Sequence, residues 1–139
     1  MIPISDDFTV VVDTCVLVHG FLRDVLFNLA EAGVFSLRLS DDILEELKRT
    51  LKGSGFKWTP SKVDWLFTEI QRVFASCIVH EYEAIQINGD LPDEKDRHVI
   101  QAAVKAKAYQ IITFNKKHFP KAVLDPLEIS DPKRCDNTL

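Results

Sequence analysis

The feature that most constrains the fold is a short β-branched run in which every position is apolar. Val10, Val11 and Val12 follow Thr9 and lead directly into Asp13. A strand with one face in water alternates apolar and polar residues, whereas a strand covered on both faces is apolar throughout. The run therefore predicts a central strand of a parallel sheet that has helices on both of its faces.

Helical and strand patterns alternate along the rest of the chain. Apolar residues at helical spacing predict helices over residues 21–32, 42–51, 61–75 and 93–108. Short apolar runs predict further strands over residues 35–39, 77–79, 110–114 and 127–129. This order favours a three-layer α/β/α sandwich with a mostly parallel sheet of about five strands.

The chain has 139 residues, of which 46% are hydrophobic. That length suits one domain with its own core, and the composition excludes extensive disorder. No linker or internal repeat is visible, so we expect one domain over residues 1–130. Residues 131–139 are predicted to form a loose C-terminal tail.

Composition also bears on compartment and partners. The three cysteines lie far apart without a CxxC pair, which argues against a zinc site and suits a reducing cytosol. The first seven residues have no signal-peptide pattern, and no apolar run approaches the roughly 20 residues of a membrane span. We therefore expect a cytoplasmic protein with no membrane contact. The formal net charge of −4 is unusual for a nucleic-acid binder, although metal ions would offset several carboxylates.

Oxygen-bearing side chains follow the predicted strands or begin the predicted helices. Asp13 and Asn115 each come after a strand, Glu46 lies on the helix after the second strand, and Asp93 and Asp96 begin the fourth helix. Ligands of parallel sheets bind beyond the carboxyl ends of the strands, where these residues would gather. Carboxylates and carbonyls are the ligands that Mg²⁺ and Mn²⁺ prefer. The sequence therefore predicts a site for a divalent cation at this edge.

Each acid also has a structural interpretation. Asp13 is a suitable cap for a following helix, and Asp93 is a suitable N-cap with Asp96 at the favoured third position. Glu46 fits an ordinary surface acid, although it lies nearer the apolar face of its helix than its neighbour Glu45. The sequence leaves these interpretations open.

Other polar and aromatic residues are assigned structural roles. Thr113 and Asn115 fit a turn, and neither His98 nor His118 has metal-ligand spacing. Trp65 is expected to pack, because it lies between the apolar residues 63 and 66.

Four segments, taken in order, resemble the four motifs of PIN domains. They are residues 10–18, 41–51, 91–103 and 111–120, and together they cover nearly the whole chain. The set is most similar to PIN proteins of the VapC-like toxin class. The resemblance implies an Mg²⁺- or Mn²⁺-dependent ribonuclease whose acids are Asp13, Glu46 and Asp96, with Asp93 as a helper. In such an enzyme the ion lowers the pKa of a bound water and stabilises charge on the phosphate.

Two positions depart from the family pattern. Asn115 stands where many PIN domains carry aspartate, which removes a negative charge and predicts weaker metal binding. An amide carbonyl can still ligate a cation or orient a water. Cys15 stands where asparagine or serine is common, which puts a polar contact near Asp13 in doubt.

The resemblance also implies partners: an RNA substrate, an antitoxin whose tail blocks the acid cleft, and a second copy in a homodimer. Basic residues near the acids, among them Lys116, Lys117 and Arg97, are candidates for holding phosphates. The alternative is a non-catalytic PIN-like RNA-binding or scaffold domain with a weakened metal site. A receiver-type domain around Asp13 ranks lower because the third strand supplies no aspartate, and no GxGxxG follows the first strand to suggest a dinucleotide.

Overall fold

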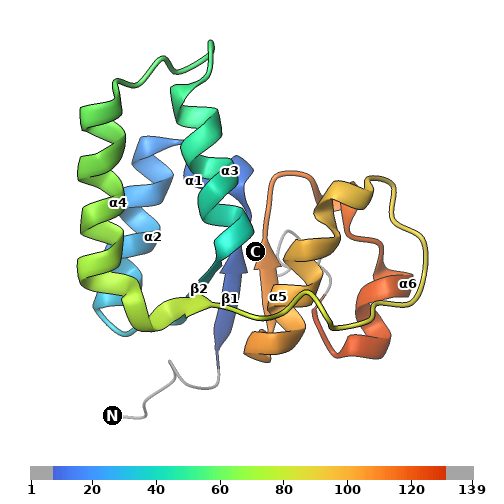
Figure 1. The fold of residues 1–139 in the computed structure, drawn as a ribbon. Helices are drawn as coiled ribbons and strands as arrows, with labels where there is room; N and C mark the ends of the chain where they lie inside the picture. The colour runs from blue at the N-terminus through green and yellow to red at the C-terminus, as the bar shows by residue number, and fades with distance from the viewer. Residues whose placement is uncertain (1–7, 131–139) are drawn as a thin grey trace.

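The structure is a computed structural model that describes residues 8–130; the predicted tail at residues 131–139 lies outside these residues. Figure 1 shows how its helices and strands are arranged. The strands are β1 (Thr9–Val12), β2 (Ser36–Ser40), β3 (Ile78–Val79) and β4 (Gln110–Ile112). The helices are α1 (Thr14–Leu17), α2 (Gly20–Glu31), α3 (Asp41–Lys52), α4 (Pro60–Phe74), α5 (Arg97–Ala106) and α6 (Lys121–Leu124). Short 3₁₀ turns span Ala75–Cys77, Glu94–Asp96, Lys116–His118 and Asp125–Leu127.

The strands form one sheet in the order β3-β2-β1-β4, and every pair is parallel. In the register, Val11 of β1 lies opposite Arg38 on one side and Ile111 on the other. Helices α2 and α4 lie on one side of the sheet and α5 and α6 on the other. The predicted three-layer α/β/α architecture is therefore confirmed.

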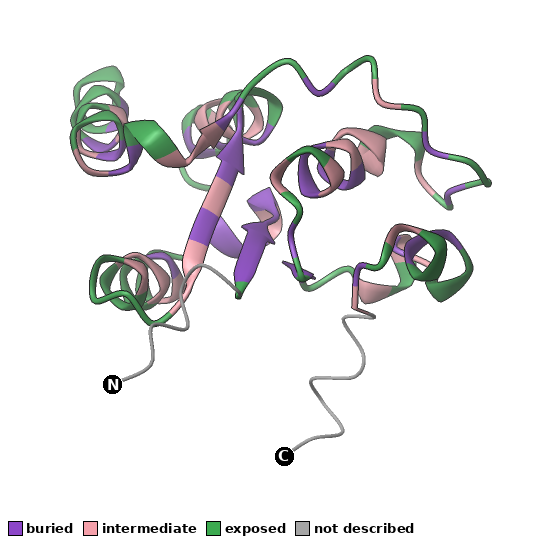
Figure 2. Ribbon diagram, turned by 90° about the horizontal axis from the view of Figure 1, so that it is seen from below, coloured by how far each residue is buried: buried purple, intermediate pink, exposed green. Residues whose placement is uncertain are grey.

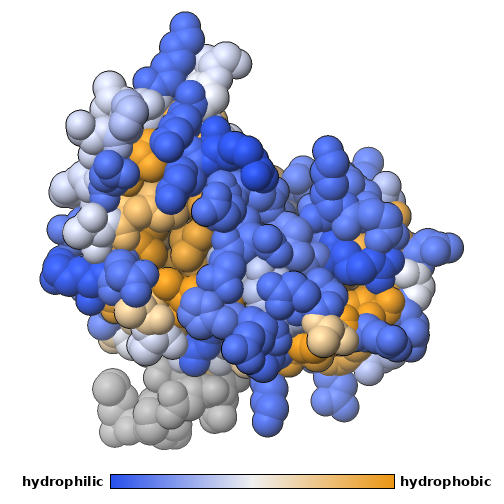
Figure 3. Space-filling view, viewed as in Figure 1, coloured by the Kyte–Doolittle hydropathy of each residue, from blue (hydrophilic) through white to orange (hydrophobic). Residues whose placement is uncertain are grey.

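The core sits on both faces of β1, whose four residues are all buried. In Figure 2 the buried residues follow the strands and the helix sides that face them. The apolar run at residues 10–12 thus has the central position that its lack of polar residues predicts. The face shown in Figure 3 is mostly hydrophilic, with hydrophobic areas beside α4 and α6.

Side-chain caps set the starts of the two helices that follow β2. Ser40 is fully buried, and its hydroxyl accepts a hydrogen bond from the Ile43 N–H at the start of α3. Thr59 caps α4 by accepting from the Lys62 N–H, and Pro60 occupies the first helical position. At the end of α2, Gly33 adopts a positive φ of 81°, which is the helix stop expected of glycine.

Two predicted elements differ from the structure. Residues 127–129 do not form a strand, because the 3₁₀ turn ends in a left-handed Glu128 and only an isolated bridge joins Ser130 to Gln110. The sheet therefore has four strands among the described residues instead of about five. The helix predicted over 93–108 is also shorter, since a 3₁₀ turn occupies Glu94–Asp96 and α5 begins at Arg97.

The sequence predicts one apolar face of α2 made of Phe21, Val25, Leu26, Leu29 and Ala32, and the structure buries this face only in part. Phe21, Val25 and Leu29, four residues apart, are 79%, 37% and 38% exposed. Leu26 of the predicted face does pack against the core, together with Leu22, Phe27 and Ala30, which the prediction did not include. Trp65 on α4, expected to pack, is 60% exposed.

The irregular segment between β3 and α5 is held by side chains of α5. Gln101 donates to the carbonyls of Glu83 and Ile85, and Arg97 donates to those of Ile87 and Gly89. These bonds satisfy backbone groups that have no strand partner. The segment therefore has a defined path over α5 despite its lack of secondary structure.

No helix among residues 8–130 has the length and apolar character to cross a membrane. In the same part of the chain, Cys15 and Cys77 are free thiols.

Candidate metal centre

Asp13 lies at the carboxyl end of the central strand and is 5% exposed. Its backbone N–H continues the sheet by donating to Ile112, at 2.9 Å. One carboxylate oxygen accepts from the Thr14 N–H at 2.8 Å, and the other accepts from the Thr113 hydroxyl at 2.9 Å. Asp13 therefore does cap α1, as its structural interpretation predicts. The same contacts fix the carboxylate at the edge where β1 and β4 both end.

Cys15 lies beside this carboxylate. Its sulfur is 3.5 Å from Asp13 Oδ2 and 3.5 Å from Thr113 Oγ1, and it accepts from the Phe114 N–H at 3.4 Å. Burial raises the pKa of Cys15, and the charge of Asp13 raises it further. The thiol is thus a weak, protonated neighbour in place of a stronger polar group.

Glu46 is held by a histidine from another helix. On α3, Glu46 is half-buried whereas Glu45 is exposed. The Nε2 atom of His98 on α5 lies 2.7 Å from Glu46 Oε1. Burial alone would lower the pKa of His98, but the contact with Glu46 and the charges of Glu46, Asp42 and Asp13 together raise it. These interactions therefore favour the protonated imidazole next to Glu46.

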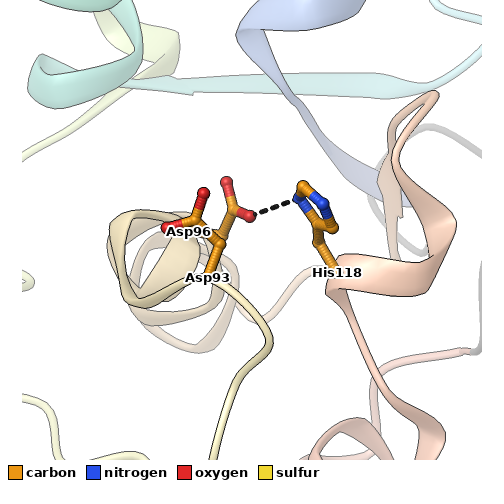
Figure 4. Close-up of side chains that lie close together, drawn as sticks. All are labelled: Asp93, Asp96 and His118. Atoms are coloured by element: carbon orange, nitrogen blue, oxygen red, sulfur yellow. Dashed lines mark hydrogen bonds and ion pairs between the residues drawn. The ribbon is translucent and has the colours of Figure 1, made fainter.

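Asp96 is held by a second histidine. Its Oδ2 atom lies 2.8 Å from Nδ1 of His118, which ends the turn Lys116–His118 after β4. Asp93 lies on the same side, so that one ligand atom from each of Asp93, Asp96 and His118 falls within 4.8 Å of the others. Figure 4 shows the two carboxylates beside each other, with a dashed line for the contact between Asp96 and the imidazole ring of His118. Asp13 and Glu46 lie outside this three-residue group.

The local backbone explains why Asp96 is available to His118. Asp93 uses its side chain to cap the 3₁₀ turn, accepting from the Lys95 N–H at 3.0 Å. Asp96 is the residue that precedes α5, yet its side chain makes no capping hydrogen bond. The predicted capping role of Asp93 is therefore confirmed, and Asp96 is the third residue after this cap, although the turn is 3₁₀ and not the first turn of an α-helix.

Charge links the acids of separate elements. The pKa of Asp13 is raised, chiefly by burial and also by the charge of Glu46, although hydrogen bonds from Thr113 and Thr14 oppose the rise. The pKa of Asp96 is also raised, first by burial and then by the charge of Asp13. Asp13 thus lies within electrostatic reach of both Glu46 and Asp96. A nearby cation would relieve this crowding of like charges, as protonation of a carboxyl also does.

The structure leaves Asn115 apart from these contacts. Its side chain is exposed and makes no capping hydrogen bond, while its backbone N–H donates to the Thr113 hydroxyl at 2.9 Å. Its role as a ligand stays a prediction. Arg97, a candidate phosphate contact, is instead paired with Glu94 at 2.6 Å in addition to its loop carbonyls.

Three contributors to this site were missed as functional residues: His98, His118 and Thr113. None of them has a spacing pattern in the sequence, because each meets its acid only through the fold. The one usable signal is that all three lie within four residues of a predicted site residue.

Comparison with known proteins identifies the family of this chain. Residues 9–117 match the family described as "PIN domain". The chain belongs to the PIN domain family. The match covers β1 to the turn after β4, and it includes every residue predicted for the metal site. The similarity to PIN domains expected from the sequence is confirmed.

A short segment also resembles a named protein. Over 35 residues the chain is 54% identical to "Putative ribonuclease VapC50" of Mycobacterium tuberculosis. The aligned segment is 25% of this chain and 21% of that protein, so the chain matches about a fifth of its relative's length. No solved structure matches the chain.

The residues present fit a divalent cation of the kind PIN domains imply. The donor set is made of carboxylate oxygens, which suit Mg²⁺ and Mn²⁺. Burial and mutual repulsion raise the pKa values of Asp13 and Asp96, which is the electrostatic state that a bound cation would relieve.

Proposed function

We propose that this PIN domain is a metal-dependent ribonuclease, and that it is the toxin of a toxin–antitoxin pair. The observation that carries the proposal is that Asp13, Glu46 and Asp96 come from different elements and that the charge of Asp13 interacts with the charges of both other acids. The family and the name of the partial relative agree with it.

In this proposal Asp13, Glu46 and Asp96 hold the cation, with Asp93 as a helper and Asn115 at the rim. When bound, Mg²⁺ or Mn²⁺ supplies positive charge that acidifies water and stabilises the charge on a phosphodiester. The chain's own residues orient the ligands. Thr113 and the Thr14 N–H fix the two oxygens of Asp13, while His98 and His118 fix Glu46 and Asp96.

The alternative is a PIN-like domain that binds RNA or a protein without cleaving. Two observations favour it: the Asn115 side chain is exposed and supplies no carboxylate, and two acids are already paired with histidines. The histidine beside each of these acids occupies a carboxylate oxygen that a cation would otherwise take.

RNA cleavage separates the two functions. The purified protein is incubated with a mixed RNA pool in Mg²⁺, Mn²⁺ or EDTA, beside Asp13→Asn and a surface control, Asp64→Asn. We expect cleavage that requires the cation and is lost in Asp13→Asn but kept in Asp64→Asn. A folded protein that shows neither cleavage nor calorimetric binding of either ion would support the non-catalytic domain.

The proposed partners follow from the same family. They are an RNA substrate, an antitoxin protein and a second copy of the chain, in the cytoplasm. Light scattering of the purified protein tests the homodimer. Co-purification with the product of the adjacent gene, followed by loss of RNA cleavage, tests the antitoxin.

A further inference from the structure

Two 3₁₀ turns, Glu94–Asp96 and Lys116–His118, bring Asp93, Asp96 and His118 together. Asp93 precedes the turn Glu94–Asp96, and the Asp96 N–H donates to the Asp93 carbonyl at 3.1 Å. Asp93 is the N-cap of this turn and Asp96 is its last residue, so one short turn carries both carboxylates. His118 ends the turn Lys116–His118, whose backbone is closed by its N–H on the Asn115 carbonyl at 2.9 Å.

The spacing of the ligand atoms suits one ion. Metal-to-ligand distances for nitrogen and oxygen are about 2.1 Å, so ligands on opposite sides of an ion are roughly 4.2 Å apart. The three atoms here lie within 4.8 Å of one another, and Nδ1 of His118 and Oδ2 of Asp96 are 2.8 Å apart. Shifts of a few tenths of an ångström in partly exposed side chains would bring all three to an ion.

We propose that Asp93, Asp96 and His118 form a mixed oxygen–nitrogen site for a first-row transition-metal dication such as Mn²⁺ or Zn²⁺, and that His118 makes this site prefer such ions to Mg²⁺. Imidazole suits transition metals, whereas Mg²⁺ takes oxygen ligands and retains its waters. The inference deepens the proposed function, because Asp96 belongs both to this triad and to the acid cluster around Asp13.

A second histidine–aspartate pair shows what the triad adds. His80 Nδ1 lies 2.9 Å from Asp41 Oδ2 at the exposed ends of β3 and β2. This pair joins the same atom types at nearly the same distance, but among the described residues it belongs to no group of three potential ligands. An ordinary His–Asp contact therefore occurs in the same protein without a third ligand, which makes His80 a matched control.

The experiment measures binding of Zn²⁺, Mn²⁺ and Mg²⁺ separately by calorimetry, in the full chain and its variants. His118→Ala should lower Zn²⁺ affinity by about tenfold or more, as expected for loss of a ligand, and should lower Mg²⁺ affinity by a smaller factor. His118→Asp keeps a ligand atom the same number of bonds from the backbone but replaces nitrogen by oxygen. It should lower Zn²⁺ affinity and raise Mg²⁺ affinity. His80→Ala should bind every ion as the unmodified protein does.

A spectroscopic readout identifies the ligand directly. With Mn²⁺ bound, electron spin echo modulation should show a coordinated imidazole nitrogen that is lost in His118→Ala and kept in His80→Ala. A folded protein that binds no transition ion, or that keeps both Zn²⁺ affinity and the nitrogen signal in His118→Ala, would overturn the site.

The experiments distinguish failure of this metal site from failure of the proposed nuclease activity. Cleavage that needs Asp13 but occurs without any His118-dependent binding refutes the triad alone. His118-dependent binding in a protein that cleaves no RNA with any ion refutes the nuclease alone.

Discussion

The hydroxyl of Thr113 donates to Asp13 across 100 positions of sequence, with 2.9 Å between Oγ1 and Oδ2. The same hydroxyl accepts from the Asn115 N–H, so one side chain joins the ends of β1 and β4 to the turn that follows. Thr113 is 6% exposed, and water does not readily replace it. The orientation of the Asp13 carboxylate therefore depends on Thr113.

Thr113→Val should impair metal binding while preserving the fold. Valine keeps the shape but removes the hydroxyl donor, which leaves Oδ2 of Asp13 with only the weak thiol donor of Cys15. We expect Mn²⁺ affinity to fall by roughly tenfold, the range found when groups that orient ligands are removed. Calorimetry measures the loss, and Thr113→Ser, which keeps the hydroxyl, should stay near the unmodified value. Equal affinity in all three proteins would show that Thr113 does not orient Asp13 for binding.

Asp13→Asn should stabilise the protein in EDTA at neutral pH. Burial raises the pKa of Asp13 above its usual 3.8, and the charge of Glu46 adds to the rise. Because the pKa is higher in the folded state, the contribution of Asp13 to stability is complete below pH 3.8. It is lost as the pH rises through the pKa of Asp13 in the folded protein. Asparagine does not ionise, so Asp13→Asn avoids this loss of stability at neutral pH. Thermal melts in EDTA should show the variant a few degrees more stable.

In thermal melts with Mn²⁺, the unmodified protein should be more stable than Asp13→Asn. A cation that binds only the folded state raises the melting temperature of the unmodified protein, and Asp13→Asn should gain less. A variant that is destabilised in EDTA, or that gains as much from Mn²⁺, would contradict the assignment of Asp13 to the metal site.

His98→Asn should destabilise the protein most at low pH. The contact with Glu46 and nearby acidic charges raise the pKa of His98 above its usual 6.5 against the effect of burial. The stabilisation is therefore complete below pH 6.5 and lost as pH rises through the folded value. Urea unfolding at several pH values should give a difference of about 1–3 kcal/mol at low pH that shrinks as pH rises. In a Glu46→Gln background the difference should lose its pH dependence.

Much of the fold follows from local pattern. The run at residues 10–12 places β1 at the centre because only a strand covered on both faces has no polar position. The ends of elements are less predictable. Asp96 has the pattern of a helix residue, but the turn Glu94–Asp96 is 3₁₀, and only the contact with His118 explains its side chain. Phe21 and Trp65 have apolar side chains that the sequence assigns to the core and the structure leaves exposed.

The residues of the candidate site also differ in how well their positions can be predicted from the sequence. Asp13 could be predicted because it follows a strand whose position is fixed by its neighbours. His98 and Glu46 are 52 residues apart, and their contact depends on how α3 and α5 pack against the sheet. No local rule encodes that distance, so the histidines of the site become visible only in three dimensions.

Tyr82→Phe should weaken the start of α3 without touching the acids. The Tyr82 side chain is fully buried, and its hydroxyl accepts from the Asp42 N–H at 2.9 Å and donates to the Asp42 carboxylate at 2.8 Å. Phenylalanine keeps the ring and loses both bonds, which should cost about 1–3 kcal/mol of unfolding free energy.

The stability difference between the unmodified protein and Tyr82→Phe should decrease as the pH rises. Burial, together with the hydrogen bond to the Asp42 carboxylate and the charge of that group, raises the pKa of Tyr82 from 10.0 to about 12, although the bond from the Asp42 N–H opposes the rise. The folded state therefore disfavours the phenolate, so the contribution of Tyr82 is complete below pH 10.0 and lost as pH rises toward 12. Urea unfolding at pH 8 and pH 11 should show the gap between the unmodified protein and Tyr82→Phe narrowing at the higher pH. The other tyrosine, Tyr109, is 49% exposed, so Tyr109→Phe is the matched control and should show neither the loss nor the narrowing. A gap that widens at pH 11 would mean that the hydroxyl is not held by Asp42.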